Sequence, residues 1–353
     1  MSVIAKIRDE TEHSITWFDN NCVIDVCEVL QAVCRLKPGK SDGYVGLASD
    51  YFLHACNELC VHVAILFTGL LVHSCIPEDL SISTVIPIPE GKHANMTNSS
   101  NYRGIALCSM YNKLFDLILL SRYYDQLCSC DLQFGFKSKR STDMCTMILK
   151  ESIAYYVNNG SSVYCTFLDA SKAFDRVEYS KLFRLLLKRQ LPAVILRMLY
   201  NMYVSHVTCV DWNGVRSSVF SVINGVKQGG IISPILFCIY IDDLMRGLAN
   251  LGVGCYIGDC YFGALAYAYD IVLIAPIVCQ NRIFIYFLIC SWTILFENHG
   301  VKILALLIPP RCPFFSTPIR KTSNIAVART QVRSTNRCPV TRFLGCWVHV
   351  WHI

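Results

Sequence analysis

Charged residues are scarce in this sequence. Asp, Glu, Lys and Arg make up 16% of the 353 residues, hydrophobic residues make up 53%, and the mean hydropathy is +0.39. Intrinsically disordered chains have the opposite composition, because they lack enough apolar surface to offset the entropy lost on folding. The composition therefore predicts a folded protein with a large hydrophobic core.

Long uninterrupted apolar runs are also lacking. The most lipid-like stretch, IFIYFLICSWTILF at residues 283–296, has 14 residues, whereas a membrane-spanning helix needs about 20. We expect a buried helix or strand there, with a membrane segment as the alternative. The first residues, MSVIAKIRDETEHSITWF, carry charges where a secretory signal needs an apolar block. The sequence thus predicts an intracellular protein, cytoplasmic or nuclear, with no membrane partner.

No C-x2-C pair occurs among the 20 cysteines, and the closest pairs are Cys56/Cys60 and Cys128/Cys130. The paired spacing typical of a zinc site is therefore missing. Because the chain is long and no secretion signal is evident, reduced thiols in the core are expected rather than a disulfide scaffold.

Acidic residues are absent from residues 298–353, which hold eight Lys and Arg. The net charge of +6 therefore divides into +8 for this tail and −2 for residues 1–297. Such a tail is predicted either to contact phosphate backbones or to form a solvated extension, and charge alone favours neither.

Helical and strand patterns alternate irregularly along the chain, with hairpins among them, which favours an α+β architecture. Helices are expected at 48–73, from about Ser109, at 179–203 with a break near Pro192, and from Ser233-Pro234. A strand that runs into a loop is expected at 82–92, a strand at 163–168, and a hairpin turn at Asn213-Gly214. Pro87 and Pro89 predict that the strand within 82–92 lies at a sheet edge.

Two carboxylates lie in apolar surroundings. The stretch GALAYAYDIVLIAP, residues 263–276, reads as strand, polar break and strand, with Tyr269 and Asp270 at the break. A charge there is costly unless something binds it. The strand VYCTFLD ends at Asp169, where a carboxylate leaves the core and meets a cation or, alternatively, caps a helix.

Two further stretches carry candidate ligand-binding residues. GVKQGGIISP, residues 225–234, combines glycines that allow close backbone approach to a ligand with the amide of Gln228. NYRGIAL places Arg103 in a predicted loop, where a guanidinium can bind a phosphate through two hydrogen bonds. Taken singly, an ordinary glycine turn and a surface arginine are the alternatives.

The order of these blocks carries more information than any one of them. NYR-G-I, Q-F-G-F, F-L-D-x-x-x-A-F-D, G-V-x-Q-G-x-x-x-S-P and Y-A-x-D follow LKPGKSDG and VIPIPEGK in this chain. From residue 36 to 276, the series resembles the reverse transcriptase domain of non-LTR (LINE-type) retrotransposons. The resemblance implies an α+β right-hand polymerase with fingers and palm, and an RNA template, a DNA primer and deoxynucleoside triphosphates as partners. It does not indicate an oligomeric state.

The resemblance also implies roles for individual residues. Asp169 corresponds to the first metal ligand of the palm, for two Mg2+ or Mn2+ ions. Phe174 corresponds to the residue under the sugar of the incoming nucleotide, which excludes a 2′-hydroxyl. Gln228 and Gly229 correspond to positions along the template and nucleotide, and Arg103 to the one that holds the triphosphate.

The Y-x-D-D hairpin of the family is altered in this chain. Its first aspartate, the second essential metal ligand, corresponds to Tyr269, and Asp270 corresponds to the second, less critical carboxylate. A neutral phenol of pKa about 10 replaces an anionic Mg2+ ligand poorly. We therefore expect Asp169 and Asp270 to be the metal ligands and the activity to be impaired.

YIDD at residues 240–243 matches the Y-x-D-D letters better, but it follows Ser233-Pro234 within a predicted helix. Successive helical residues diverge by about 100°. Asp242 and Asp243 are therefore not expected to face one cation, and we interpret YIDD as part of a structural helix.

These patterns predict four regions: a weakly patterned segment at 1–34, fingers and the start of the palm at 35–160, the palm at 161–276, and a degenerate basic region at 277–353 with an incomplete thumb. The lack of a recognisable endonuclease pattern suggests a truncated copy of a mobile element. The favoured function is an impaired RNA-directed DNA polymerase. A catalytically inactive nucleic-acid-binding remnant, and a membrane or packing protein, are the alternatives.

Overall fold

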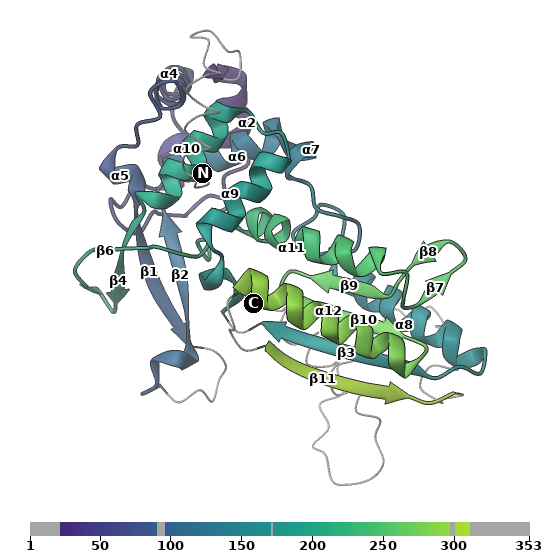
Figure 1. Ribbon diagram of the computed structural model, residues 1–353. Helices are drawn as coiled ribbons and strands as arrows, with labels where there is room; N and C mark the ends of the chain where they lie inside the picture. The colour runs from purple at the N-terminus through teal and green to yellow at the C-terminus, as the bar shows by residue number, and fades with distance from the viewer. Residues whose placement is uncertain (1–21, 90–95, 171, 297–300, 311–353) are drawn as a thin grey trace. The chain divides into compact units, whose positions relative to one another are not determined.

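The computed structural model describes residues 22–89, 96–170, 172–296 and 301–310 (Figure 1). The chain forms two compact units: unit 1 combines Met1–Ser129 with Lys172–Tyr240, and unit 2 combines Cys130–Ser171 with Ile241–Ile353. Both contain helices and mainly antiparallel sheets, which confirms the α+β class. The units interleave along the sequence, whereas the expected regions are contiguous, so the boundaries of fingers and palm stay predictions.

Unit 1 contains a five-stranded sheet of order β2-β1-β4-β5, with β6 also paired to β4. Its strands are β1 (Ile82–Pro89), β2 (Tyr102–Cys108), β4 (Val207–Trp212), β5 (Val215–Arg216) and β6 (Phe220–Ser221). The predicted turn connects β4 to β5: Asn213 and Gly214 have φ of 53° and 84°. Two positive φ values are what a type I′ hairpin turn requires, so this prediction is confirmed.

The expectation that the strand within 82–92 is an edge strand is wrong. β1 lies between β2 and β4, and it pairs in parallel with β4 from Ile82 to Val85. At Pro87 and Pro89 the pairing that the structure describes is with β2 alone. Proline has no N–H to donate to a second neighbour. The prolines therefore mark the half of the strand that has one partner.

The helices of unit 1 pack against one another and form a core. They are α2 (Val26–Cys34), α3 (Ser49–Leu53), α4 (Asn57–His73), α5 (Glu78–Ser81), α6 (Met110–Arg122), α7 (Tyr124–Leu127), α9 (Tyr179–Lys188) and α10 (Ala193–Val204). The predicted 48–73 helix is thus interrupted between α3 and α4, whereas the predicted break near Pro192 separates α9 from α10. Phe67, Leu71, Leu114 and Phe183 are almost fully buried in this core.

Helix α2 begins within the segment expected to be weakly patterned. The Asp25 side chain accepts a hydrogen bond from the N3 backbone, and the Glu28 side chain accepts one from the Asp25 N–H, which forms a capping box. The D-x-x-E spacing before an apolar run is the sequence signal that was missed. Glu28 also pairs with Arg122 of α6 at 2.5 Å, which ties α2 to the core.

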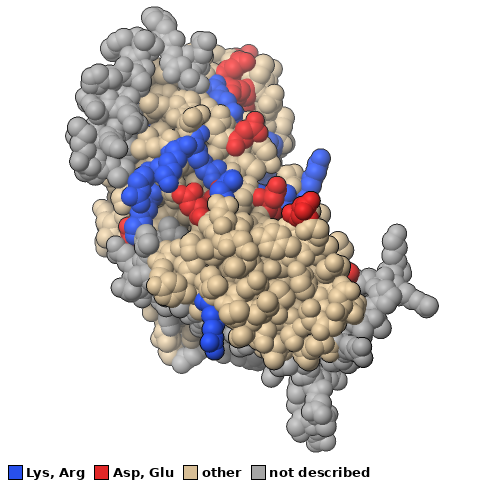
Figure 2. Space-filling model, turned by 45° about the vertical axis from the view of Figure 1, so that its right-hand side comes forward, with Lys and Arg blue, Asp and Glu red and all other residues tan. Residues whose placement is uncertain are grey.

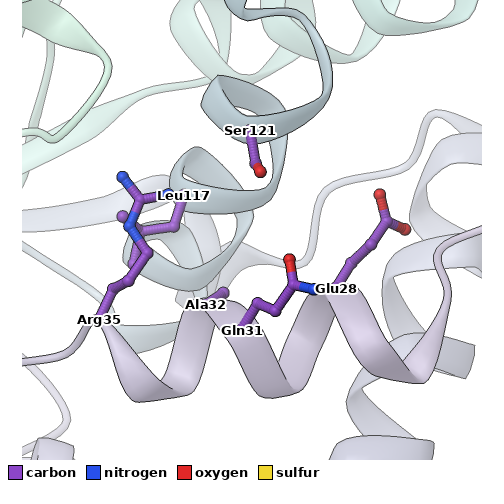
Figure 3. Close-up of a pocket in the computed structure, with 6 residues that line it drawn as sticks. All are labelled: Glu28, Gln31, Ala32, Arg35, Leu117 and Ser121. Atoms are coloured by element: carbon purple, nitrogen blue, oxygen red, sulfur yellow. The ribbon is translucent and has the colours of Figure 1, made fainter.

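A pocket of about 300 Å³ lies between α2 and α6 (Figure 3). It is lined by Glu28, Gln31, Ala32, Arg35, Leu117 and Ser121. None of the candidate site residues contributes to this lining.

Unit 2 is built on a four-stranded antiparallel sheet of order β11-β3-β10-β9. The strands are β3 (Val163–Ala170), β9 (Ala264–Tyr267), β10 (Asp270–Ala275) and β11 (Val301–Ile308); a separate hairpin pairs β7 (Tyr256–Ile257) with β8 (Cys260–Tyr261). On one face, Cys165 and Phe167 of β3 share a core with α8 (Thr142–Asn158). On the other, Thr166 hydrogen-bonds Asn281 of α12 (Val278–Phe296) at 3.0 Å. The alternation along β3 thus lets one strand contact two helices, as Figure 1 shows.

The apolar 283–296 stretch is helical and belongs to α12. The expectation that it is buried holds on one side only, because Phe284 and Leu288 are buried whereas Ile283 is 45% and Tyr286 is 74% exposed. Over the described ranges, no helix has both the length and the apolar character needed to cross a membrane. The basic tail lies almost entirely outside the described residues.

The cysteines are less uniformly buried than expected. Among the described ones, eight are buried and seven are exposed. Burial raises the pKa of the Cys145 thiol to about 12 and that of Cys255 to about 12. These thiols are therefore neutral core residues, as expected for the buried group.

Candidate active site

Residues 263–276 form the predicted strand, turn and strand in unit 2. Asp270 pairs with Tyr267 across β9 and β10, so Ala268 and Tyr269 form a two-residue turn. Ala268 is fully buried and left-handed, with φ of 56°. Asp270 is only 8% exposed. The hairpin therefore presents a nearly buried carboxylate at the first residue of β10.

The backbone places the positions of Asp169 and Asp270 next to each other. Leu168 of β3 pairs with Ile271 of antiparallel β10, and Asp169 follows the first as Asp270 precedes the second. Facing residues of paired strands have Cβ atoms about 4.5–5.5 Å apart. The side chain of Asp169 lies outside the part that the structure describes. The two positions meet at one end of the sheet, and their roles as metal ligands stay predictions.

The YIDD segment lies in α11 (Ser233–Asn250), as predicted, and its two aspartates have different environments. Asp242 is 1% exposed and accepts hydrogen bonds from the Cys130 N–H at 2.6 Å and from Arg246 Nε at 2.8 Å. Asp243 is exposed. Because Asp242 is buried and bonds a backbone N–H and an arginine, it has a structural role, and Asp243 does not share its environment.

In unit 1, hydrogen bonds attach the GVKQGG loop to neighbouring segments. The Val226 N–H donates to Phe174 O at 2.8 Å, and the Ala106 N–H donates to Gln228 O at 2.6 Å. Gln228 Nε2 also donates to Asp175 Oδ1 at 3.2 Å. The structure therefore joins Gln228 both to β2 and to the segment that contains Phe174.

Gly229 lies directly against β2. Its φ is +118°, and a Cβ built there would lie 2.5 Å from Ala106 O. Gly229→Ala is therefore expected to lower the free energy of unfolding by about 1–3 kcal/mol and to move the loop, which urea titration would measure. Gly46→Ala is the matched control, because Gly46 has φ of +81° but no atom within 4 Å of its Cβ position. Equal losses in both variants would show that the approach to Ala106 is not tight.

Phe174 lies in the 3-10 helix η3 (Ala173–Arg176) and stacks on Phe237 of α11. The ring centroids are 4.9 Å apart and the planes differ by 8°. Phe237 is fully buried, so the side chain that supports the Phe174 ring is fixed in the core. The structure thus gives this candidate sugar contact a rigid base.

The expectation that Arg103 lies in a loop is wrong. It belongs to β2 and faces Ile88 of β1, with its side chain exposed. The alternating pattern of Tyr102–Cys108 and its full pairing with β1 explain the strand. Arg103 precedes Ala106 by three residues, or roughly 10 Å of strand. Arg103 therefore lies on the same strand as Ala106, whose N–H bonds Gln228 O.

A buried carboxylate that sequence reasoning missed lies beneath the loop. Asp116 of α6 is 6% exposed, and its Oδ2 accepts a hydrogen bond from the Ile232 N–H at 3.2 Å. Burial raises the pKa of Asp116 to about 6, while the Ile232 hydrogen bond and the charge of Lys227 oppose this shift. Lys227 Nζ also lies 5.8 Å from the ring centroid of Tyr203. In the sequence, the one acidic residue within the apolar run LFDLILL was the feature that could have indicated a buried carboxylate.

A second missed residue, Gln133, lies in the QFGF block of unit 2. It is 1% exposed, its Oε1 accepts from the Ala268 N–H at 2.8 Å, and its Nε2 donates to Ala268 O at 3.0 Å. One side chain thus bonds both backbone groups of the first turn residue in the β9–β10 hairpin. The block formed part of the resemblance, but no role was attached to it.

Basic side chains gather on parts of the surface. Figure 2 shows one face on which Lys and Arg lie close to a few Asp and Glu, while most of the remaining surface is uncharged. On α9, Lys181, Arg184 and Lys188 have the i, i+3, i+7 spacing that puts them on one side of a helix, and Lys181 pairs with Glu178. Such a stripe attracts polyanions, including phosphate backbones.

The chain is similar to known polymerases in this region. A family model described as "Reverse transcriptase (RNA-dependent DNA polymerase)" matches residues 90–277. A 115 kDa protein in the type-1 retrotransposable element R1DM of Drosophila melanogaster is 26% identical over 253 residues, which cover 71% of this chain and 23% of that protein.

A Pol polyprotein from the type-2 retrotransposable element R2DM of Drosophila melanogaster is 29% identical over 207 residues, or 57% of this chain and 19% of that protein. The chain therefore spans about a quarter or less of these relatives. A solved telomerase from Candida Tropicalis, in complex with an RNA fragment, has a TM-score of 0.48 and 12% identity, covering 74% of this chain and 47% of that one.

Proposed function

The chain belongs to the reverse transcriptase (RNA-dependent DNA polymerase) family, and from this we propose that it carries out RNA-directed DNA synthesis, with an activity reduced by Tyr269. The resemblance to reverse transcriptases of non-LTR retrotransposons is confirmed by the family match and by the relatives from such elements. Family membership also gives the chain the right-hand polymerase fold class. The RNA template, the DNA primer and the deoxynucleoside triphosphates are part of the proposal.

One observation carries the proposal: the positions of Asp169 and Asp270 are neighbours at one end of the β3–β10 pair. Two separate sequence blocks meet there, and the two aspartates are 101 residues apart. Packing of the core does not explain acidic residues at these positions, because the core needs apolar residues on these strands. Carboxylates at adjoining strand ends are the oxygen donors that Mg2+ prefers. Convergence of this kind favours a cation site over two independent helix caps.

The available ligands fit a metal pair incompletely. Asp169 and Asp270 would hold the ions, which when bound lower the pKa of the primer 3′-hydroxyl and stabilise the pyrophosphate leaving group. Among the side chains that the structure describes, no three of His, Cys, Asp or Glu come together to hold a metal. The turn instead offers the phenol of Tyr269, which is half-buried. The missing negative charge is our reason for proposing impaired activity.

The remaining candidates are proposed to bind the nucleotide. Arg103 would pair with the triphosphate, Phe174 would lie against the sugar, and Gln228 with Gly229 would line the base and template. The fixed backbone of the loop and the Phe174–Phe237 stack support these roles, because a binding site needs side chains that do not reorganise when the ligand arrives.

Phe174→Val tests the sugar contact. In the Tyr269→Asp background, this variant is expected to lower the preference for deoxynucleotides over ribonucleotides by about tenfold or more, because space for a 2′-hydroxyl opens beside Phe237. The ratio of kcat/KM for dATP and ATP on one primer and template measures the preference. Phe220→Val, at a 49% exposed position on β6, is the control. An unchanged ratio would show that Phe174 does not face the sugar.

The function itself is tested by extension of a DNA primer on an RNA template with Mg2+ or Mn2+, using the chain as it stands and its Tyr269→Asp form. Extension supports the polymerase. Binding of the hybrid without extension by either form would contradict the polymerase and favour the nucleic-acid-binding remnant. Loss of both binding and extension would contradict both functions.

A further inference from the structure

We propose that Gln133 is the positioning residue of the β9–β10 turn, which fixes the direction in which positions 269 and 270 present their side chains. The hydrogen bonds between Gln133 and Ala268 of the turn are part of the fold of unit 2. Their consequence for catalysis rests on the proposed function.

The amide of Gln133 matches Ala268 in one orientation. The Ala268 carbonyl only accepts and its N–H only donates, so Nε2 must face the first, at 3.0 Å, and Oε1 the second, at 2.8 Å. No other neutral side chain of this length offers a donor and an acceptor with the same spacing. The residue type at 133 is therefore set by the backbone of the turn.

The segment around Gln133 lies directly against the turn. The Gly135 N–H also donates to Gln133 Oε1 at 2.8 Å, which orients the amide. A Cβ on Gly135 would lie 2.3 Å from Ala268 N, so only glycine allows this approach. The Phe134 N–H donates to Ala266 O, and the Ala266 N–H donates to Leu132 O, both at 2.8 Å. Residues 132–135 thus run along β9 and end at the turn.

Asp242 holds the start of the same segment. Its Oδ1 accepts from the Cys130 N–H at 2.6 Å, and Lys137 Nζ donates to Cys130 O at 2.5 Å. Gln133 N–H donates to Cys130 O at 3.1 Å. The buried aspartate of YIDD therefore fixes the segment that carries Gln133, and so acts on the turn through it.

The turn needs this support for a physical reason. A non-glycine residue in the left-handed region costs about 1–2 kcal/mol, and Ala268 has φ of 56°. Ala268 is also fully buried, so loss of Gln133 would leave an N–H and a C=O unpaired, at about 1–3 kcal/mol each. The turn would then rearrange rather than keep the N–H and C=O of Ala268 buried without hydrogen-bond partners. Residues 269 and 270 would change direction with it.

Amide hydrogen exchange tests the positioning directly. Gln133→Met, of similar length but unable to bond Ala268, is expected to lower protection of the Ala268 amide at least tenfold while amides of β3 keep theirs. Gln31→Met, at an exposed position of α2, is the control. Gln133→Asn, which keeps the amide but is one methylene shorter, is the second variant if Gln133→Met loses protection throughout unit 2.

Activity in the Tyr269→Asp background separates positioning from general stability. Loss of a partner that orients a metal ligand typically costs about 10–100-fold, so Gln133→Met is expected to lower kcat at least tenfold with little change in KM for the nucleotide. Unchanged Ala268 protection, or equal changes in kcat and KM from general instability, would overturn the proposal. If the Tyr269→Asp protein extends no primer, the proposed function fails, and exchange at Ala268 still decides the role of Gln133.

Discussion

Tyr269→Asp is expected to raise primer extension on an RNA template by about 100-fold or more. Losing a residue that only orients a metal ligand costs about 10–100-fold, and a ligand contributes more because its charge offsets the two cations. The turn should accept the change, because Ala268, not position 269, has the left-handed backbone, and Gln133 bonds Ala268 by its main chain. Tyr269 is half-buried, so the shorter aspartate meets no steric barrier.

Two control variants isolate the charge. Tyr269→Asn removes the ring and adds a short polar group without a negative charge, so it is expected to leave extension near the starting level. Asp169→Asn in the Tyr269→Asp background is expected to abolish the gain. Single-turnover extension with Mg2+ and with Mn2+ measures all three. Equal rates for the unaltered chain and its Tyr269→Asp form, or an equal gain in the asparagine variant, would show that position 269 does not contribute a metal ligand.

Short-range patterns predicted the parts of the site that depend on neighbours in sequence. The short run VYCTFLD predicted β3, and the polar break between two apolar runs predicted the turn at Tyr269. The position of Asp270 beside Asp169 is different, since no local pattern pairs β3 with β10; the family resemblance implied that the two positions belong to one site. The divergence of Asp242 and Asp243 followed from helical geometry alone.

The parts that were missed depend on contacts distant in sequence. Gln133 bonds a residue 135 positions away, and Asp116 bonds one 116 positions away. A glutamine and an aspartate look alike in sequence whether they are solvated or bonded to buried backbone. The sequence predicted a loop just before apolar residues at Arg103, whereas pairing with β1 makes the segment a strand. Local preference yields to tertiary pairing at such positions.

The stability of unit 1 is expected to depend on two buried groups whose pH effects oppose each other. His206 is 3% exposed; its Nδ1–H donates to Ser81 O at 2.7 Å, and its Nε2 lies 3.2 Å from Ser83 Oγ. Burial, with a smaller contribution from Lys227, lowers the pKa of His206 to about 3. Asp116 has its pKa raised to about 6, and Lys227 acts on it as well.

The sign differs because the groups charge in opposite directions. Unfolded histidine binds a proton below about pH 6.5 while buried His206 stays neutral, so stability falls by about 3 kcal/mol between pH 7 and 4. Asp116 holds its proton in the folded state up to about pH 6, whereas unfolded aspartate loses it near 3.9. Its contribution is therefore present at low pH and is lost as pH rises, by about 2 kcal/mol over the same window.

A variant that lacks one of the two titrating groups should show the pH dependence of stability that the other group causes. Relative to the unaltered chain, Asp116→Asn is expected to become more stable by about 2 kcal/mol as pH rises from 4 to 7, because the ionised carboxylate is absent. His206→Asn should show the reverse, gaining about 3 kcal/mol on acidification over the same range. Urea unfolding at matched ionic strength measures both differences, and comparison with the unaltered chain cancels the other carboxylates. Parallel pH profiles for all three proteins would show that neither group titrates differently in the folded and unfolded states. Asp116, which lies beneath the loop that contains Gln228, would then have to be hydrated.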